Sequence, residues 1–220
     1  MIERNGVYYP FEDFFQKHTN IYNFGQDTRN EALKCVKNHR TAVDIGAHIG
    51  ISVNCWAPLF EKVVAFEPMV DHYECLLKNT ARFNNVEAHN CAISNESRML
   101  RGAYRTGKNS GSFQLLDDDW STKKETTIYD IPSRRLDEFV FDHVDLIKVD
   151  VEGWEFEVLK GAKNTIMTHR PVLMIEFTEG GNHKSMHRYS VDAYYELIHE
   201  LNYKAVYQGD DTIYVPLEQI

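Results

Sequence analysis

The chain has 220 residues, the length of one domain over 1–220, and 43% hydrophobic and 26% charged residues, as in ordinary globular proteins. Its net charge of −9 argues against binding to nucleic acid or to an anionic membrane surface, both of which favour basic proteins. No apolar run approaches the ~20 residues of a transmembrane helix, and the first residues lack a signal-peptide layout, so we expect a cytoplasmic protein without a membrane span.

The first elements lead to a glycine turn. Residues 1–40 are expected to form an N-terminal annex, rich in aromatics and ending in a helix over 29–38. An apolar strand then carries Asp44 and enters a turn at Gly46, and Gly50 begins an amphipathic helix. Glycine permits so tight a turn and lets the backbone approach a ligand closely. The helix that follows would point its free N–H groups at that ligand.

Strands and helices then alternate. A short strand over 63–66 ends in Glu67, a helix is expected over 71–83, and a third strand with its exit loop over 86–93. An acidic residue about twenty positions after a glycine turn is typical of ribose binding. This alternation predicts parallel strands joined by right-handed crossovers, and the two signals together indicate a cofactor that contains adenosine.

Residues 94–132 interrupt this alternation. The segment is polar and contains three short strand-like pieces, at 99–104, 112–116 and 126–131. We therefore expect an inserted hairpin region that is exposed to solvent. The acidic run 117–119 is expected to be a solvated loop tip.

The alternation resumes with a short helix around 136–141 and a buried strand over 144–149 that ends in Asp150. One helix is expected from 154 to 166, then a fifth strand over 172–177 that contains Glu176. A polar loop over 178–190 precedes a helix for which Ser190 is a plausible N-cap. Two strands at 203–207 and 212–215, linked by Gln-Gly-Asp-Asp, predict a C-terminal antiparallel hairpin.

The spacing of the glycines discriminates between cofactors. A dinucleotide-binding turn has the pattern Gly-x-Gly-x-x-Gly, whereas this chain has Asp-x-Gly-x-x-x-Gly, with His48 in place of a middle glycine. A pyrophosphate would lose its closest approach to the backbone, and the carboxylate of Asp44 would repel it. A ligand with sulfonium and ammonium groups suits this turn, so the pattern favours S-adenosylmethionine.

Four segments resemble the FkbM-type family of S-adenosylmethionine-dependent methyltransferases. They are Val-Asp-Ile-Gly-Ala-His-Ile-Gly (43–50), Val-Ala-Phe-Glu-Pro (64–68), Arg-Leu-Asp-Glu-Phe (135–139) and, most specific, Asp-Leu-Ile-Lys-Val-Asp-Val-Glu-Gly-Trp-Glu-Phe-Glu-Val-Leu-Lys-Gly-Ala (145–162). The resemblance implies the α/β class I methyltransferase (Rossmann-like) fold, with a seven-stranded, mostly parallel sheet whose last strand is antiparallel. It also implies an O-methyltransferase that acts on hydroxyls of sugars, glycans or natural products.

The resemblance further implies which residues bind the cofactor, and His48 departs from the asparagine that the family usually has there. The methionine part would lie against the glycine turn, the ribose hydroxyls against Glu67, and the adenine beside the loop 90–92. Asp150 would lie near the transferring methyl group. The expected cofactor-binding set is therefore Asp44, Gly46, His48, Gly50, Glu67, Asn90, Ala92 and Asp150.

Methyl transfer from a sulfonium requires alignment of the acceptor oxygen, the methyl carbon and the sulfur, and a hydroxyl acceptor must also lose its proton. Ligands of open α/β sheets lie at the carboxyl ends of the strands. The expected catalytic residues are Asp150, Glu152, Glu176 and His183, with His187 as a further candidate. We expect no metal site, although Asp150, Glu152 and a loop histidine could instead bind a divalent cation.

Other charged residues and histidines have structural explanations. Glu155 and Glu157 are expected to be solvated charges on a helix face. Lys148 is expected to extend its ammonium group toward solvent or to pair with a carboxylate. His72 shows no ligand spacing and is expected to be structural, as are His39, His89, His143, His169 and His199.

Two alternatives to a methyltransferase stay open at this point. One is an oxidoreductase that uses NAD, which the glycine spacing disfavours. The other is a protein that keeps the fold without the reaction and acts as a binding module. The expected partner of the leading hypothesis is a small-molecule or glycan acceptor, which the N-terminal annex, the insertion at 94–132 and the loop at 178–190 would select.

Overall fold

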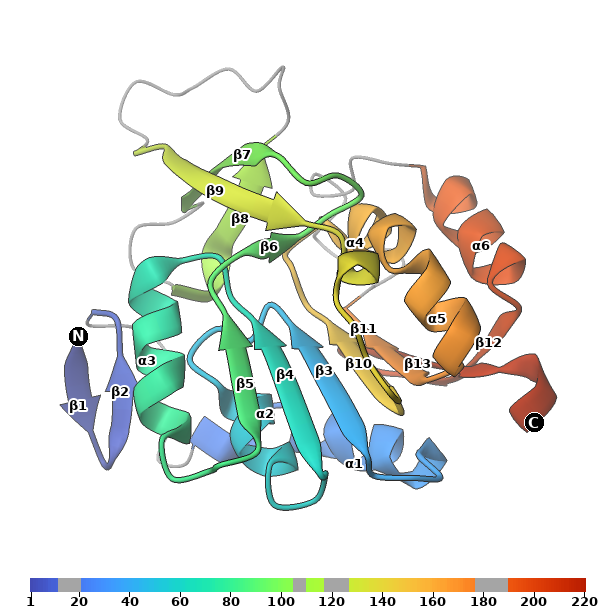
Figure 1. Ribbon diagram of the computed structural model, residues 1–220, viewed down its shortest axis with the longest axis horizontal. Coiled ribbons are helices and arrows are strands. Elements are labelled where there is room, and N and C mark those ends of the chain that lie inside the picture. Colours follow the sequence, from blue (N-terminus) through green and yellow to red (C-terminus); the bar gives the residue numbers. More distant parts are fainter. Residues whose placement is uncertain (12–20, 105–109, 117–126, 177–189) are drawn as a thin grey trace.

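The computed structural model describes residues 1–11, 21–104, 110–116, 127–176 and 190–220. Its centre is a seven-stranded sheet with helices on both faces (Figure 1). In their order across the sheet, the strands are β12 (Tyr203–Gln208), β13 (Thr212–Pro216), β11 (Val172–Ile175), β10 (Leu146–Val149), β3 (Thr41–Ile45), β4 (Lys62–Phe66) and β5 (Val86–His89). The α-helices are α1 (Gln26–Cys35), α2 (Ile51–Trp56), α3 (Val70–Thr80), α4 (Glu155–Gly161), α5 (Lys163–His169) and α6 (Val191–Glu200).

The strand directions follow from the connections. The strands β5, β4, β3, β10 and β11 are mutually parallel, and the described crossovers between them carry α2, α3 and the pair α4–α5. The last strand, β13, runs antiparallel to both of its neighbours, β11 and β12. The predicted α/β fold with a seven-stranded sheet is confirmed. No helix among the described residues is long and apolar enough to span a membrane.

Both faces of the sheet are buried, because successive strand residues point to opposite sides. On one face, Ala42 and Ala65 pack against α2 and α3 through Val53, Trp56 and Leu76. On the other face, the packed residues from strands and from α4, α5 and α6 include Val43, Val64, Ile147, Val158, Ile166, Tyr194 and Ile198. This double layer fixes the positions at which the parallel strands end, and therefore the floor of any site above them.

The predicted insertion contributes to a second, four-stranded sheet. In their order across it, the strands are β6 (Ala92–Ile93), β9 (Tyr129–Arg134), β7 (Met99–Tyr104) and β8 (Phe113–Leu116). A short 3-10 helix, η3 (Ser110–Ser112), precedes β8. Figure 1 shows this second sheet beyond the arrowheads of β3, β4 and β5, which is where a ligand of the large sheet would lie. Its inward side joins the main core through Leu100, Leu115 and Ile131.

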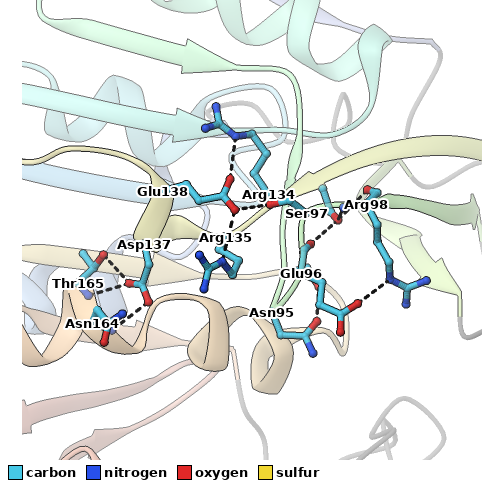
Figure 2. A network of polar contacts seen from close by, with 12 residues as sticks. Asn95, Glu96, Ser97, Arg98, Arg134, Arg135, Asp137, Glu138, Asn164 and Thr165 are labelled. Carbon is cyan, nitrogen blue, oxygen red and sulfur yellow. Dashed lines mark hydrogen bonds and ion pairs between the residues drawn. The ribbon is translucent and has the colours of Figure 1, made fainter.

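The single helix expected over 154–166 is wrong, because the chain forms α4 and α5 with a break at Ala162. Asp137 starts the second helix: its carboxylate accepts hydrogen bonds from the backbone N–H groups of Asn164 and Thr165 and from the Thr165 hydroxyl (Figure 2). A Cβ atom on Gly161 would lie 1.9 Å from the carbonyl oxygen of Ser94. The last residue of α4 therefore packs directly against the backbone at the start of the insertion.

The helix expected over 136–141 is only the 3-10 turn η4 (Leu136–Glu138). Its last residue, Glu138, lies between Arg134, Arg135 and the hydroxyl of Ser97, so this turn is held by polar contacts to the base of the insertion (Figure 2). These exposed ion pairs contribute little stability individually. Their effect is to fix where the insertion enters and leaves the main domain.

The N-terminal annex begins with a hairpin, β1 (Ile2–Arg4) and β2 (Val7–Tyr9), which packs beside α3. Asn79 holds it there: its side-chain oxygen accepts from the Tyr8 N–H, and its nitrogen donates to the Tyr8 carbonyl. The 3-10 turn η2 (Ile21–Asn23) and α1 follow, and α1 starts at Gln26 rather than at 29. Three residues of the annex, Phe24, Gly25 and Arg29, line the cavity that is described below.

Candidate active site

One cavity of about 490 Å³ lies at the carboxyl ends of the parallel strands. This volume falls in the range of pockets that hold ligands of drug size, about 300–1,000 Å³. Residues from the glycine turn, from the strand ends, from the insertion and from the C-terminal hairpin line it together. Of the predicted site residues, those that line the cavity are Asp44, Gly46, His48, Glu67, Ala92, Asp150, Glu152 and Glu176.

The turn after β3 has three residues with positive φ: Gly46 at 84°, His48 at 50° and Gly50 at 87°. A Cβ on Gly46 would lie 1.8 Å from the carbonyl oxygen of Asp150, so this position requires glycine. Histidine is one of the residues that tolerate the left-handed region, as is asparagine, which explains why both suit position 48. A Cβ on Gly50 would lie 2.7 Å from Leu76, and Gly50 contributes to helix packing rather than to the cavity wall.

Glu67 is fixed by the turn and by the start of α3. Its Oε2 atom accepts a hydrogen bond of 2.8 Å from the backbone N–H of His48, and its Oε1 atom accepts one of 2.8 Å from the N–H of Met69. The residue is 4% exposed and lines the cavity. Burial also lowers the pKa of His48 well below its usual value, so that its imidazole is neutral at pH 7.

Asn90 supports this corner from behind. Its Nδ2 atom donates hydrogen bonds of 2.9 Å to the carbonyl oxygens of Glu67 and Pro68, and Asn90 is absent from the residues that line the cavity. The next residues, Cys91 and Ala92, do line it. The contact between Asn90 and an adenine therefore stays a prediction, and its visible role is to hold the backbone that carries Glu67.

Asp44 is buried next to Lys148 on the neighbouring strand β10. The Oδ1 atom of Asp44 has no hydrogen-bond partner among the described residues, and Lys148 Nζ lies 3.8 Å from it. Burial raises the pKa of Asp44 to about 6, because the attraction of Lys148 offsets only part of the cost of removing the carboxylate from water. An oxygen that is buried, charged and unsatisfied is suited to a cationic group of a ligand.

Asp150, Glu152 and Glu176 come together as the sequence predicts, with one oxygen of each within 4.8 Å of the others. Lys148 Nζ lies 2.8 Å from Asp150. Burial alone would raise the pKa of Asp150, but the ion pair with Lys148 outweighs burial and holds that pKa below its usual value. The negative charge of Asp150, and then burial, raise the pKa of Glu176 well above its usual value. The two neighbouring carboxyl groups therefore have pKa values displaced in opposite directions.

Glu155 is not the solvated charge that the sequence suggests, because it is 1% exposed. Its Oε1 atom accepts hydrogen bonds from the backbone N–H groups of Gly153 (2.9 Å) and Val151 (3.4 Å). Between those donors, Glu152 adopts a left-handed φ of 55°, a strained conformation for a residue other than glycine. Burial raises the pKa of Glu155 to about 7. Glu155 therefore holds the turn that presents Glu152 to the cavity.

Three further residues that line the cavity, two of them acidic, were not predicted from the sequence. Asp210 and Asp211, in the link between β12 and β13, line the cavity, and burial raises the pKa of Asp211 to about 6. The sequence did contain a signal for the two aspartates. The last strand was expected to run antiparallel, so the link before it lies at the edge where the parallel strands end. Arg29 of α1 also lines the cavity while its guanidinium donates to the carbonyl oxygens of Tyr22 and Phe24.

Some predicted residues fall outside the described part of the chain. They are His183 and His187, with the rest of the loop up to 189, and the acidic run 117–119. Their roles stay predictions. Lys148, by contrast, takes the second of its two expected roles, since it pairs with Asp150 and lies beside Asp44.

The fold and site define a class of protein. A seven-stranded α/β sheet with a glycine turn after its central strand and an acidic residue after the next strand is the arrangement that the sequence resemblance implied for class I methyltransferases. A family model described as the methyltransferase FkbM domain matches residues 44–205, which is most of the chain. The chain therefore belongs to the FkbM methyltransferase family, and its cofactor is S-adenosylmethionine. With that cofactor, the NAD alternative falls away.

Solved structures share the fold. The methyltransferase FkbM from Methylobacillus flagellatus KT is 22% identical over 81% of this chain, with a TM-score of 0.54. The match covers 43% of that protein, so this chain spans less than half of its length. The N-methyltransferase NodS from Bradyrhizobium japonicum WM9, in complex with S-adenosyl-L-homocysteine, is 12% identical with a TM-score of 0.54, over 93% of this chain and 91% of that one. A comparison with curated proteins finds no match.

Proposed function

We propose that this methyltransferase transfers a methyl group to a hydroxyl group of a sugar, glycan or natural product. The observation that carries the proposal is the cluster of Asp150, Glu152 and Glu176 in the cavity, in which Lys148 lies 2.8 Å from Asp150 and the pKa values of Asp150 and Glu176 are displaced in opposite directions. A hydroxyl acceptor must give up its proton during transfer, and a carboxylate placed to accept it contributes about 10²–10⁴-fold to the rate. The protein supplies such a group where the sequence resemblance expects the methyl group.

The residues present fit S-adenosylmethionine. The unsatisfied Oδ1 of Asp44 suits the ammonium group of the methionine part, and Gly46, which packs against the Asp150 carbonyl, lines the cavity beside it. The carboxylate of Glu67, held by two backbone N–H groups, is positioned to accept hydrogen bonds from ribose hydroxyls. His48 supplies one of those N–H groups, and Ala92 supplies part of the wall expected beside the adenine.

The chemistry divides between the cofactor and the chain. S-adenosylmethionine supplies an electrophilic methyl group on a positively charged sulfur. The chain holds the acceptor in line and removes its proton. Asp150 accepts the hydrogen bond of the acceptor hydroxyl, Lys148 keeps Asp150 ionised until transfer, and Glu176 shares the proton that arrives. Glu152, on its strained turn, provides a further hydrogen-bond acceptor for a polyol.

Two measurements test the proposal. The first is calorimetric titration with S-adenosylhomocysteine: Asp44→Ala should weaken binding at least tenfold, about 1.4 kcal/mol, whereas Asp71→Ala, an exposed acid on α3, should not. Unchanged affinity of the Asp44 variant would show that the cofactor binds elsewhere.

The second measurement uses S-adenosylmethionine with an isotope-labelled methyl group and a panel of acceptors, in which neutral sugars and small phenols are paired with the corresponding amines. Label on hydroxyl oxygen is the expected result. Label on nitrogen alone would contradict the O-methyltransferase proposal. Tight cofactor binding without transfer to any member would favour the binding-module alternative.

A further inference from the structure

His72 of α3 occupies a position that its sequence context did not reveal. It is 2% exposed and lines the cavity. Its Nδ1 atom lies 3.4 Å from Oε1 of Glu67, and its Nε2 atom lies 3.0 Å from the hydroxyl oxygen of Tyr104. Its ring also meets that of His48 edge to face, at 4.6 Å between centroids. One imidazole thus contacts the carboxylate, the glycine turn and the insertion at once.

The contacts of His72 determine its hydrogen bonding. An ionised carboxylate can only accept, so the tautomer of His72 with its proton on Nδ1 favours the 3.4 Å contact between Nδ1 and Oε1 of Glu67. Nε2 is then left for Tyr104, whose hydroxyl can donate or accept. Together with the two backbone N–H groups that donate to Glu67, this side-chain contact limits the rotation of the carboxylate away from the cavity.

Tyr104 connects this arrangement to the insertion. It is the last residue of β7, and its ring packs edge to face against Phe113, Tyr129 and Phe11, at 5.4, 6.0 and 5.9 Å between centroids. Phe113 and Leu115 of β8 line the cavity. The hydrogen bond to His72 therefore ties the aromatic cluster of the insertion to the part of the cavity that contains Glu67.

We propose that His72 is a positioning residue for cofactor binding. It orients the carboxylate of Glu67 toward the ribose hydroxyls and, through Tyr104, anchors β7 and β8 as a wall over the adenosine end of the cavity. The proposal rests on the cofactor placement given above. It assigns the insertion a part in holding the cofactor, in addition to the role in acceptor selection that the sequence suggested.

The test compares two ligands, S-adenosylhomocysteine and its 2′,3′-dideoxyribose analogue, by calorimetric titration of the full chain. In the wild type, the hydroxyls should improve affinity about tenfold, as expected of hydrogen bonds to a charged group. His72→Leu should remove most of this preference by weakening S-adenosylhomocysteine while leaving the analogue within about twofold. His72→Asn, whose Nδ2 can take the place of Nδ1, should restore most of it.

Tyr104→Phe tests the second contact, because it removes the hydroxyl and keeps the ring. It should weaken both ligands by the same factor, about threefold, since the wall lies over the adenosine end as a whole. Tyr129→Phe, a neighbour in the same aromatic cluster, is the matched control and should change neither affinity. His39→Leu, an exposed histidine that packs on Phe60, is the control for His72.

The outcomes separate the inference from the placement on which it rests. Glu67→Gln should abolish the preference for ribose hydroxyls; if it does and His72→Leu does not, the positioning role is wrong and the placement stands. If neither variant changes the preference, the placement itself is wrong. Equal weakening of both ligands by His72→Leu would show a merely structural role and overturn the proposal. If His72→Leu fails to fold, His72→Asn decides the question. A folded His72→Asn protein with as little preference for the ribose hydroxyls as Glu67→Gln would contradict the proposal.

Discussion

The carboxylates at the two ends of the cavity have different environments. At the proposed adenosine end, both oxygens of Glu67 are held by backbone N–H groups, and His72 adds a side-chain contact. At the acidic end, Asp150, Glu152 and Glu176 lie within 4.8 Å of one another, and Asp211 lines the same cavity. Lys148 is the cation that pairs with this group among the described residues.

The difference separates binding from chemistry. A carboxylate whose hydrogen bonds are satisfied by the backbone is rigid and suits recognition of a fixed part of the cofactor. Carboxylates that are crowded and partly desolvated have displaced pKa values, which is the property that proton transfer at neutral pH requires. Crowding by Asp150 and burial raise the pKa of Glu176, whereas the ion pair with Lys148 lowers that of Asp150.

The largest effect is expected when a charge at the acidic end is removed, because this should change turnover without changing cofactor binding. Asp150→Asn should reduce turnover by at least about 10²-fold, because the carboxylate expected to receive the acceptor proton is then missing. The affinity for S-adenosylhomocysteine should stay within about threefold, since Asp44 and Glu67 provide the main expected contacts to the cofactor. Initial rates on an acceptor found with the labelled-methyl panel give turnover, and Glu157→Gln, which pairs with Lys160 on α4, is the control. Unchanged turnover would remove Asp150 from catalysis.

A second prediction concerns pH. The pKa of Asp44 in the free protein is about 6, and a bound ammonium group should lower it, so the affinity for S-adenosylhomocysteine should decrease below pH 6. One coupled proton allows at most about a tenfold decrease per pH unit. Titrations between pH 4.5 and 8 measure it. Asp44→Asn should bind S-adenosylhomocysteine weakly, and its affinity should depend less on pH. This variant separates the titration of Asp44 from that of Asp211, because Asp211 is unchanged in it. The same pH dependence in the wild type and in the variant would refute the assignment to Asp44.

Stability provides a third test. The folded-state pKa of Glu155, about 7, lies above its ordinary value of 4.5, so the folded protein binds this proton more tightly than the unfolded chain. Its contribution to the free energy of unfolding is therefore fully present below pH 4.5 and is lost as the pH rises to about 7, by up to about 1.4 kcal/mol per pH unit. Glu155→Gln keeps the acceptor oxygen without titrating. Denaturant unfolding across this range should show a flatter dependence in the variant, and equal slopes would contradict it.

The smallest expected effect is that of metal removal. Lys148 already offsets part of the charge of the acidic end, and the expected mechanism uses a proton rather than a cation. Treatment with EDTA should therefore leave turnover within about twofold, well below the factor expected of a general base. A loss of activity that Mg²⁺ or Mn²⁺ restores would instead support the alternative in which Asp150 and Glu152 bind a divalent cation.

The sequence by itself determined the local features. The alternation of apolar strands and amphipathic helices predicted the seven-stranded sheet, and Ser190 caps α6 by accepting a hydrogen bond from the N–H of Ala193, as its position suggested. The glycine turn and Glu67 were visible because their signals depend on short, fixed spacings along the chain. Asp150 and Glu176 were expected at one edge of the sheet because parallel strands end there.

Only the tertiary structure decided which polar residues that edge would collect from elsewhere. Glu155 is buried because the turn at 151–153 offers it backbone N–H groups, and Asp137, distant in sequence, divides the expected helix into α4 and α5. Asp211 reaches the cavity from the β12–β13 link, and His72 lines it from α3 while contacting Tyr104 of the insertion. These contacts join residues far apart in the chain, and no local periodicity or spacing records such a meeting.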